Sequence, residues 1–210
     1  FLLGVGISAN LITTQEGRAY PKRSGLQAWL NLPRSEQVRA LTAAWTDSTL
    51  YHDLWHVPGL HPDPDAGFPY DPLVGREALA EFLMQLVPAQ SWWSLDDFVE
   101  MIHEAEPDFQ RPGGDYDSWY IRNNAGDYLR GFESWFAIEG ALLDYYLTGP
   151  MHWLGLTDIA EDAVRLTAYG RAFLALIDWP MPPEPSDNVQ IEGDGTLIVS
   201  RKVSRLDRFQ

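Results

Sequence analysis

The chain of 210 residues has no cysteine, half as many basic as acidic side chains, and no long apolar run. The missing cysteines exclude a disulfide framework and thiolate metal sites, and they suit a cytoplasmic protein. Because no run of about 18 apolar residues occurs, no segment is expected to span a membrane. A GxxxxGK[ST] phosphate loop is also absent, which excludes ATP hydrolysis by machinery of that type.

The shortage of basic residues is uneven along the chain. In total, 15 Lys and Arg stand against 30 Asp and Glu, for a net charge of −15. Residues 1–45 hold five basic and two acidic side chains, residues 196–210 hold four and one, and the middle holds six and 27. The middle therefore repels phosphate backbones, which disfavours a general nucleic-acid clamp, whereas both ends are basic.

The two ends of the sequence indicate a fragment of a longer protein. The chain begins at Phe1, without methionine, in "FLLGVGI", which lacks the basic region and cleavage site of a signal peptide. Near the other end, "NVQIEGDGTLIVSRKVSRLDRFQ" predicts a β-hairpin that turns through "EGDG" and is followed by the start of a helix at Ser204.

Hydrophobic residues make up 45% of the chain, which is enough to build a core. Apolar residues recur at helical spacing in four stretches, and these predict amphipathic helices. In the third stretch, Ser94 is the expected N-cap and Asp97 follows three residues later. The predicted helices cover residues 33–45, 75–87, 94–104 and 131–147.

Two proline-containing stretches interrupt the helices. Residues 57–75, "VPGLHPDPDAGFPYDPLVG", hold five prolines and three glycines, which predict a linker or an ordered loop because proline lacks an N–H donor and fixes φ. Residues 104–119, "EAEPDFQRPGGDYDSW", are irregular too, but their tyrosine and tryptophan indicate that this stretch packs against the core.

One short pattern occurs twice. Leu11 precedes Gly25, and Leu156 precedes Gly170, by 14 residues each, with Glu16 and Glu161 in between. In the second copy, "GLTDI" and "AVRLT" predict two strands, which are followed by a helix. The order helix, helix, helix, antiparallel wing, helix is a winged-helix plan, and the repeat predicts two such modules.

The expected fold class is α+β, mostly α, with tandem winged-helix modules of which the first is truncated, small β-hairpin wings and a C-terminal β-hairpin. The predicted segments are residues 1–57 (the end of a first module and the following helix), 58–74 (a proline-rich connection), 75–180 (a second module with a loop insertion) and 188–210 (the start of a further hairpin-containing domain).

Several stretches resemble a known family. "YYLTGPMHWLGLTDIAEDAVRLTAYGRAFL" is similar to the winged-helix segment of bacterial proteins grouped with the N-terminal region of XPB-like DNA-repair helicases. "LQAWLNLPRSEQVRALTAAW" with "DLWHVPGL" resembles the connection between two modules, and the C-terminal hairpin resembles the opening of their next domain. The resemblance implies a helicase-associated, non-catalytic region, and it rests on apolar and turn positions.

DNA binding by a winged helix needs Lys and Arg on the third helix and on the wing. The presumed third helix of the second module instead carries Glu133, Glu139 and Asp144, and its wing turn is "AEDA". We therefore expect no DNA contact from this module.

Basic side chains do occur at both ends of the chain. The first wing and the C-terminal end supply the candidate DNA-binding residues, namely Arg18, Lys22, Arg23, Arg201 and Lys202. The recognition helix of the first module is mostly missing, so half of a DNA-binding site is expected.

Tryptophan is abundant, with nine residues, and most are expected in the core. Trp92 and Trp93 are the exception, because the pair falls between two helices and both rings cannot easily point inward. They are the candidate partner-binding residues of an aromatic docking surface. Residues 60–120, with 13 acids, are expected to form a solvated acidic face or a docking surface for a basic partner.

Two patterns raise enzymatic alternatives. His52 and His56 stand four residues apart, and His61, Asp63 and Asp65 follow, so zinc or manganese ligands can be drawn from them. The flanking prolines and the absence of an HExxH base favour a structural role. The acid pairs at 96–97, 104 and 106, and 115 and 117 could supply the acid and base of glycoside hydrolysis. However, nothing fixes any pair at a catalytic separation, and helix-dipole complementation is the plainer explanation of the first pair.

Three hypotheses follow. The leading one is a non-catalytic, non-enzymatic winged-helix scaffold of a larger helicase-related or regulatory protein, without cofactors, that contacts a protein partner or other domains of its parent chain, and DNA through its basic ends. The second is a DNA-binding transcriptional regulator. The third is a metal-dependent hydrolase that uses His52, His56 and His61. In each case we expect a cytoplasmic protein without membrane contact.

Overall fold

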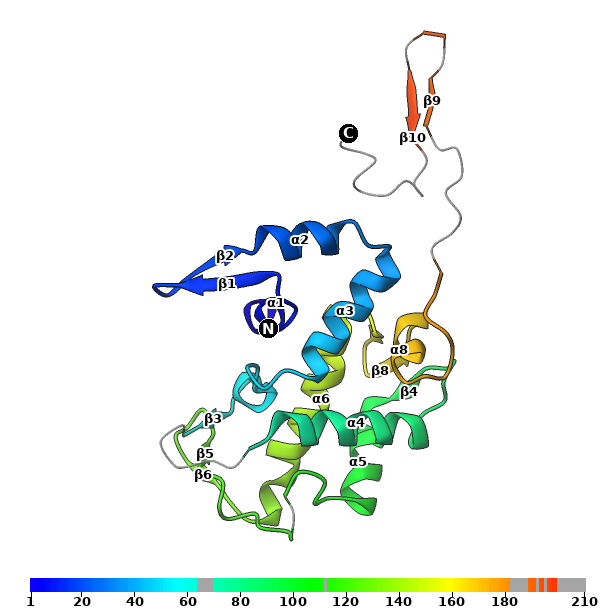
Figure 1. The fold of residues 1–210 in the computed structure, drawn as a ribbon. Helices are drawn as coiled ribbons and strands as arrows, with labels where there is room; N and C mark the ends of the chain where they lie inside the picture. The colour runs from blue at the N-terminus through cyan, green and yellow to red at the C-terminus, as the bar shows by residue number, and fades with distance from the viewer. Residues whose placement is uncertain (64–69, 112, 182–188, 192, 195, 200–210) are drawn as a thin grey trace.

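The computed structural model describes residues 1–63, 70–111, 113–181, 189–191, 193–194 and 196–199. Within these ranges the fold is mixed α+β with helices in the majority, and the strands form four small antiparallel sheets (Figure 1). No helix in the described ranges has the length and apolar character needed to cross a membrane.

The chain begins with a helix, a hairpin and a second helix, which we name the first hairpin unit. It consists of α1 (Leu2–Ser8), β1 (Ile12–Gln15), β2 (Arg18–Pro21) and α2 (Arg23–Leu30). The hairpin turn at Glu16 and Gly17 has positive φ at both residues, +49° and +73°, which glycine adopts without steric cost.

A second hairpin unit repeats this arrangement near the other end of the described chain. It consists of α7 (Pro150–Trp153), β7 (Thr157–Ala160), β8 (Ala163–Leu166) and α8 (Ala168–Phe173). Thr157 pairs with Leu166 as Ile12 pairs with Pro21, so each residue of the second hairpin corresponds to the residue 145 positions earlier. The two hairpins predicted from the repeated pattern are therefore present, in the same register.

Four helices lie between and around the two units. These are α3 (Arg34–Thr46), α4 (Pro72–Leu86), α5 (Leu95–Ala105) and α6 (Ala141–Thr148). Ser94 caps α5 as predicted, since its hydroxyl accepts a hydrogen bond from the Asp97 N–H at 3.1 Å. α4 begins three residues earlier than expected because the Asp71 carboxylate caps it by accepting from the Leu73 N–H.

The prediction of one continuous helix over residues 131–147 is wrong. Gly131 has φ +70°, and it is followed by a 3₁₀ turn, η3 (Phe132–Ser134), and a π turn, η4 (Phe136–Gly140), before α6 begins. The π turn contains Glu139, which is fully buried. The extra residue in the π turn changes the helical periodicity, and Glu139 faces the core where a regular α-helix was expected to place it at the surface.

Very short strands build two three-stranded sheets. β4 (Trp93–Ser94) extends the second hairpin in the order β4-β8-β7. A further sheet, in the order β3-β5-β6, joins segments that are far apart in the sequence, and its strands are β3 (His61–Pro62), β5 (Ile121–Arg122) and β6 (Tyr128–Leu129). The stretch expected to be a proline-rich connection thus contributes one strand to this sheet.

The C-terminal hairpin predicted around "EGDG" is present as β9 (Val189–Ile191) paired with β10 (Leu197–Val199) (Figure 1). The helix expected from Ser204 lies outside the described residues.

One hydrophobic core joins the described elements between residues 5 and 174. It extends from Val5 in α1 through α3, α4, α5 and α6 to Leu174 after α8. Tyr116 and Trp119 are buried in it, which confirms that the irregular stretch at 104–119 packs down. The 3₁₀ turn η1 (Asp53–His56) also contributes, through Leu54.

The tryptophans are divided between the core and the surface. Trp45, Trp119 and Trp135 are buried, but Trp55, Trp92 and Trp153 are each more than 40% exposed. Trp93 and Trp179 are partly buried and pack against the core, so five of the nine tryptophans lie in it or against it. The three exposed rings lie in or beside short elements, namely η1, β4 and α7.

Candidate interaction surface

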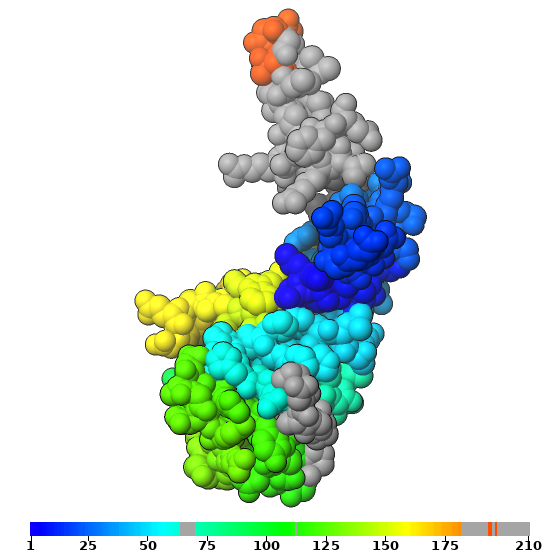
Figure 2. Space-filling view, turned by 90° about the vertical axis from the view of Figure 1, so that its left-hand side faces the viewer, coloured from blue at the N-terminus to red at the C-terminus, as the bar shows by residue number. Residues whose placement is uncertain are grey.

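An apolar groove of about 540 Å³ lies between the first hairpin unit and the helices α3 and α7. Its walls are almost entirely hydrophobic. Fourteen residues line it, namely Phe1, Leu2, Val5, Gly6, Leu11, Ile12, Ala19, Tyr20, Pro21, Leu26, Trp29, Leu41, Trp153 and Leu154. Several of them are well exposed, with Leu2 at 80% and Trp153 at 53%. Figure 2 shows the first hairpin unit, in blue, projecting from the cyan and green body of the molecule.

Local structure holds the groove open in a defined shape. Phe1 contacts Tyr51 and Trp153 edge to face, at 5.5 and 5.1 Å between ring centroids, so the start of α1 is fixed on the body. On the far wall, Trp29 Nε1 donates to the Gln37 carbonyl at 3.1 Å, which ties α2 to α3. The groove is therefore built by packed elements and not by a loose loop.

The three basic residues predicted in the first hairpin unit lie beside this groove. Arg18, Lys22 and Arg23 are exposed, at β2 and at the start of α2. Lys22 Nζ donates to Asn10 Oδ1, while the one acidic residue of the same hairpin is Glu16 in its turn. Because Arg18 and Lys22 adjoin the lining residues Ala19 and Pro21 in the sequence, we call the three exposed basic residues the basic rim. The other two candidates, Arg201 and Lys202, lie outside the described residues.

Trp92 and Trp93 lie on a different face, at the edge of the second hairpin. Trp93 is in β4, pairs with Val164 and packs on Phe98, with ring centroids 5.1 Å apart. Trp92 is 42% exposed, and the Arg165 guanidinium lies over its ring at 4.6 Å. The structure therefore separates the pair, because Trp93 is a packing residue and only Trp92 faces the solvent.

The three histidines do not gather into one centre. His52 stacks on Trp55, His56 stacks on Tyr51, and His61 Nε2 is 2.9 Å from Asn124 Oδ1. Within the described residues, no group of three or more His, Cys, Asp or Glu side chains is arranged to hold a metal ion.

Two of the three acid pairs have local structural roles. Asp96 and Asp97 occupy the exposed first turn of α5. Asp115 Oδ1 accepts hydrogen bonds from the N–H groups of Asp117 and Ser118, and these bonds lower the pKa of Asp115.

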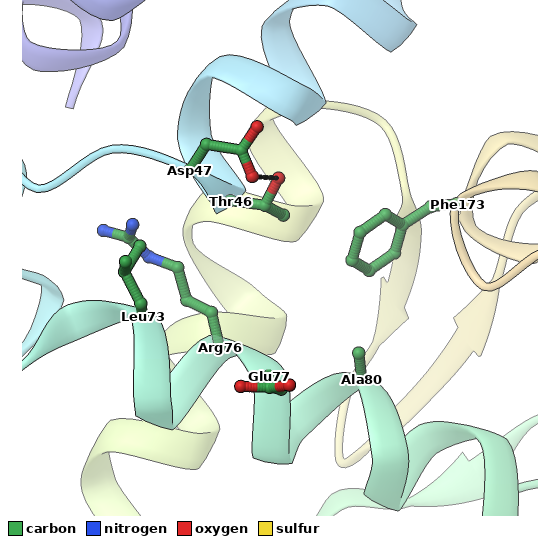
Figure 3. Close-up of a pocket in the computed structure, with 7 residues that line it drawn as sticks. All are labelled: Thr46, Asp47, Leu73, Arg76, Glu77, Ala80 and Phe173. Atoms are coloured by element: carbon green, nitrogen blue, oxygen red, sulfur yellow. Dashed lines mark hydrogen bonds between the residues drawn. The ribbon is translucent and has the colours of Figure 1, made fainter.

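A second pocket, of about 380 Å³, opens between α3, α4 and α8 (Figure 3). Phe173 and Ala80 point into it, and Asp47 and Glu77 lie on its rim. Arg76 is its only basic lining residue, but the guanidinium is turned away to Asp53 and to the carbonyls of Trp45 and Ser48. No lining residue is thus both basic and free to meet a ligand, so we assign the pocket no role.

Sequence reasoning missed a buried polar cluster beside the π turn. Arg111 Nε donates to Glu139 Oε1, and both side chains are almost completely buried. The Arg111 guanidinium lies over Trp119 at 4.1 Å. Burial raises the pKa of Glu139 to about 7. Glu139 therefore does not face a partner, as a residue on the outside of a recognition helix would.

The only signal for this cluster in the sequence is Arg111, one of the two basic residues in the acidic stretch 60–120. Beside it, both amide atoms of Gln110 are buried without a hydrogen-bond partner in the described structure.

Comparisons with known protein families, with curated proteins and with solved structures gave no match. The function is therefore inferred from the groove, the basic rim and the repeated unit alone.

Proposed function

We propose that this chain is a non-catalytic interaction module that binds protein through the apolar groove of its first hairpin unit. The observation that carries this proposal is the groove itself, with Leu2, Tyr20 and Trp153 exposed along it. A contiguous apolar patch rimmed by polar side chains is typical of a protein-binding surface, and aromatic anchors supply most of the affinity in such surfaces.

We propose further that the chain has the tandem winged-helix architecture predicted from the sequence and that it is part of a larger helicase-related or regulatory protein. The support for this architecture is the element order α4, β4, α5, α6, β7, β8, with the first strand on the outer edge of the sheet β4-β8-β7. The first hairpin unit has the same hairpin register as the second, which supports the assignment of the first unit to a truncated winged-helix module.

A peptide-display selection against the whole chain tests the proposal. Ligands are selected on the wild type and counter-selected on Ala19→Glu, which places a carboxylate in the apolar wall. Gln15→Glu is the matched control, because it adds the same charge to the same hairpin outside the groove. Ligands that bind the wild type and Gln15→Glu at micromolar concentrations but not Ala19→Glu support the proposal. If Ala19→Glu retains all selected ligands, the groove is not the binding surface.

A second candidate function, DNA binding, is favoured by the exposed cluster of Arg18, Lys22 and Arg23. Its test is fluorescence anisotropy with duplex and single-stranded DNA at two salt concentrations. Phosphate contacts predict binding that weakens steeply with salt and is lost when the three residues are changed to Glu. Binding that is absent, or indifferent to these changes, removes this candidate.

A further inference from the structure

The second hairpin unit shows what covers the surface that the first unit leaves open. Because the two hairpins share one register, each groove residue in β1 and β2 has a counterpart 145 positions later. Four groove residues lie in these strands, namely Ile12, Ala19, Tyr20 and Pro21. Three of their four counterparts, Thr157, Val164 and Leu166, are buried.

The contrast is sharpest at the second and fourth positions of the compared strands β8 and β2. Val164 and Leu166 in β8 are each 1% exposed, whereas their counterparts Ala19 and Pro21 in β2 are exposed. In the second unit the outer edge of β8 is covered by β4, which is followed directly by α5. Trp93 pairs with Val164 and Ser94 pairs with Ala163, and Phe98 of α5 packs on Trp93. In the described structure, β2 has no partner on its second edge.

The edge of β2 is suited to accept such a strand. Ala19 is the counterpart of Val164, and its N–H group faces the free edge, because N–H groups alternate between the two edges and that of Lys22 donates to Leu11. An unpaired strand edge beside an apolar surface is the template used when a peptide adds to a sheet.

Charge specifies the partner further. The side chains that α5 turns to solvent include Asp96, Asp97, Glu100 and Glu104, all exposed. Around the first unit, the corresponding rim carries Arg18, Lys22 and Arg23. An acidic amphipathic segment would therefore be attracted to this rim, while a basic one would be repelled.

We infer that the groove binds an acidic strand–helix segment, in which a short strand with an aromatic residue pairs with β2 and the following amphipathic helix lays its apolar face across the hairpin. The inference rests on the proposed function and names its class of partner. The occupant is a segment of the same kind as Ser91–Ala105, supplied to the first unit in the way that this chain supplies it to the second.

The probe is a fluorescent peptide with the sequence of residues 91–105, "SWWSLDDFVEMIHEA", added to the intact chain. A scrambled peptide of the same composition is the control for charge and hydrophobicity. We expect saturable binding that is at least ten-fold weaker for Ala19→Glu and within two-fold of wild type for Gln15→Glu. Circular dichroism confirms that both variants fold, as expected for exposed positions.

Hydrogen exchange locates the peptide. Strand addition predicts slower exchange of the Ala19 amide, which faces the free edge of β2, with unchanged exchange in β8. Equal binding by the scrambled peptide, or protection of β8 in place of β2, overturns the inference. If the peptide fails to bind while display-selected ligands still depend on Ala19, the groove binds another kind of partner. If neither binds, the proposed function fails as well.

Discussion

Arg76 and Asp53 bring opposite charges into the centre of the core, where each is at most 3% exposed. Arg76 Nε donates to Asp53 Oδ2 at 2.8 Å, its Nη1 donates to the Trp45 and Ser48 carbonyls, and Trp45 Nε1 donates to Asp53 Oδ1. The pair thereby ties α4 to the end of α3 and to η1.

Asp53→Ala leaves the Arg76 guanidinium buried without its counter-charge. We expect the free energy of unfolding to fall by about 3–5 kcal/mol. Urea denaturation followed by tryptophan fluorescence measures the loss. Thr14→Ala, at an exposed hairpin position, is the control and should change stability by less than about 0.5 kcal/mol. An unchanged unfolding midpoint for Asp53→Ala would show that this pair does not stabilise the core.

Glu139 gives the stability a pH dependence. Burial raises its pKa from 4.5 to about 7, so between these values the folded chain holds a proton that the unfolded chain has lost. The stability contributed by this proton is complete below about pH 4.5 and is lost as the pH rises toward 7. Relative to Glu139→Gln, the wild type should lose about 2–3 kcal/mol across that range.

The measurement is a set of urea titrations between pH 4.5 and 7 on the wild type, on Glu139→Gln and on Glu133→Gln. Glu133 is exposed on the same segment, so its variant should keep the wild-type slope. Parallel slopes for the wild type and Glu139→Gln would contradict the raised pKa.

At the scale of elements, the glycine that ends each copy of the repeated pattern has a steric explanation. A Cβ on Gly25 would lie 2.2 Å from the Asn10 carbonyl oxygen, and one on Gly170 would lie 2.1 Å from the Leu156 carbonyl oxygen. In both units the helix after the hairpin can approach the start of the hairpin only because this side chain is absent.

Gly170→Ala and Gly25→Ala should each destabilise the chain by about 1–3 kcal/mol, since the obstructing atom belongs to the backbone and cannot rotate away. Thermal denaturation followed by circular dichroism measures the effect. Gly193→Ala, at a position with open space around it, should leave the melting temperature unchanged. Equal melting temperatures for all three variants would show that the close approach is not required.

The predictable elements are those with local signals. The spacing of Val38, Leu41 and Trp45 gave α3, the Ser94 cap gave the start of α5, and the repeated leucine and glycine gave both hairpins. The sheet β3-β5-β6 was not predictable, because its strands are two residues long and its pairing depends on contacts that are distant in the sequence.

Of the candidate site, the basic rim was predictable and the groove was not. Arg18, Lys22 and Arg23 stand out in an acidic chain, but an apolar groove depends on which hydrophobic residues remain uncovered after folding, and single residues do not reveal this. The burial of four charged side chains was not predicted either, for the opposite reason. Asp53, Arg76, Arg111 and Glu139 are of types that are usually exposed, and only their tertiary partners hold them inside.

For the whole molecule, the continuous core determines how the chain unfolds. The segment boundaries inferred from the sequence, at 57 and 75, predict modules joined by a connection. However, Leu60 and Tyr70 of that connection are buried in the same core as Val5 and Leu174. Phe1 of the first hairpin unit also packs on Trp153 of the second. Residues that share one core lose their packing together.

We therefore expect a single cooperative unfolding transition between residues 1 and 181. Far-ultraviolet circular dichroism reports on the helices, and fluorescence reports on the nine tryptophans, which are spread from Trp29 to Trp179. In a urea titration both signals should give the same midpoint and the same slope, as two-state unfolding requires. Leu154→Ala, in the contact region between the units, should shift both signals equally. Two separated transitions, with only one displaced by Leu154→Ala, would mean that the hairpin units unfold independently. The groove could then open while the rest of the chain stays folded.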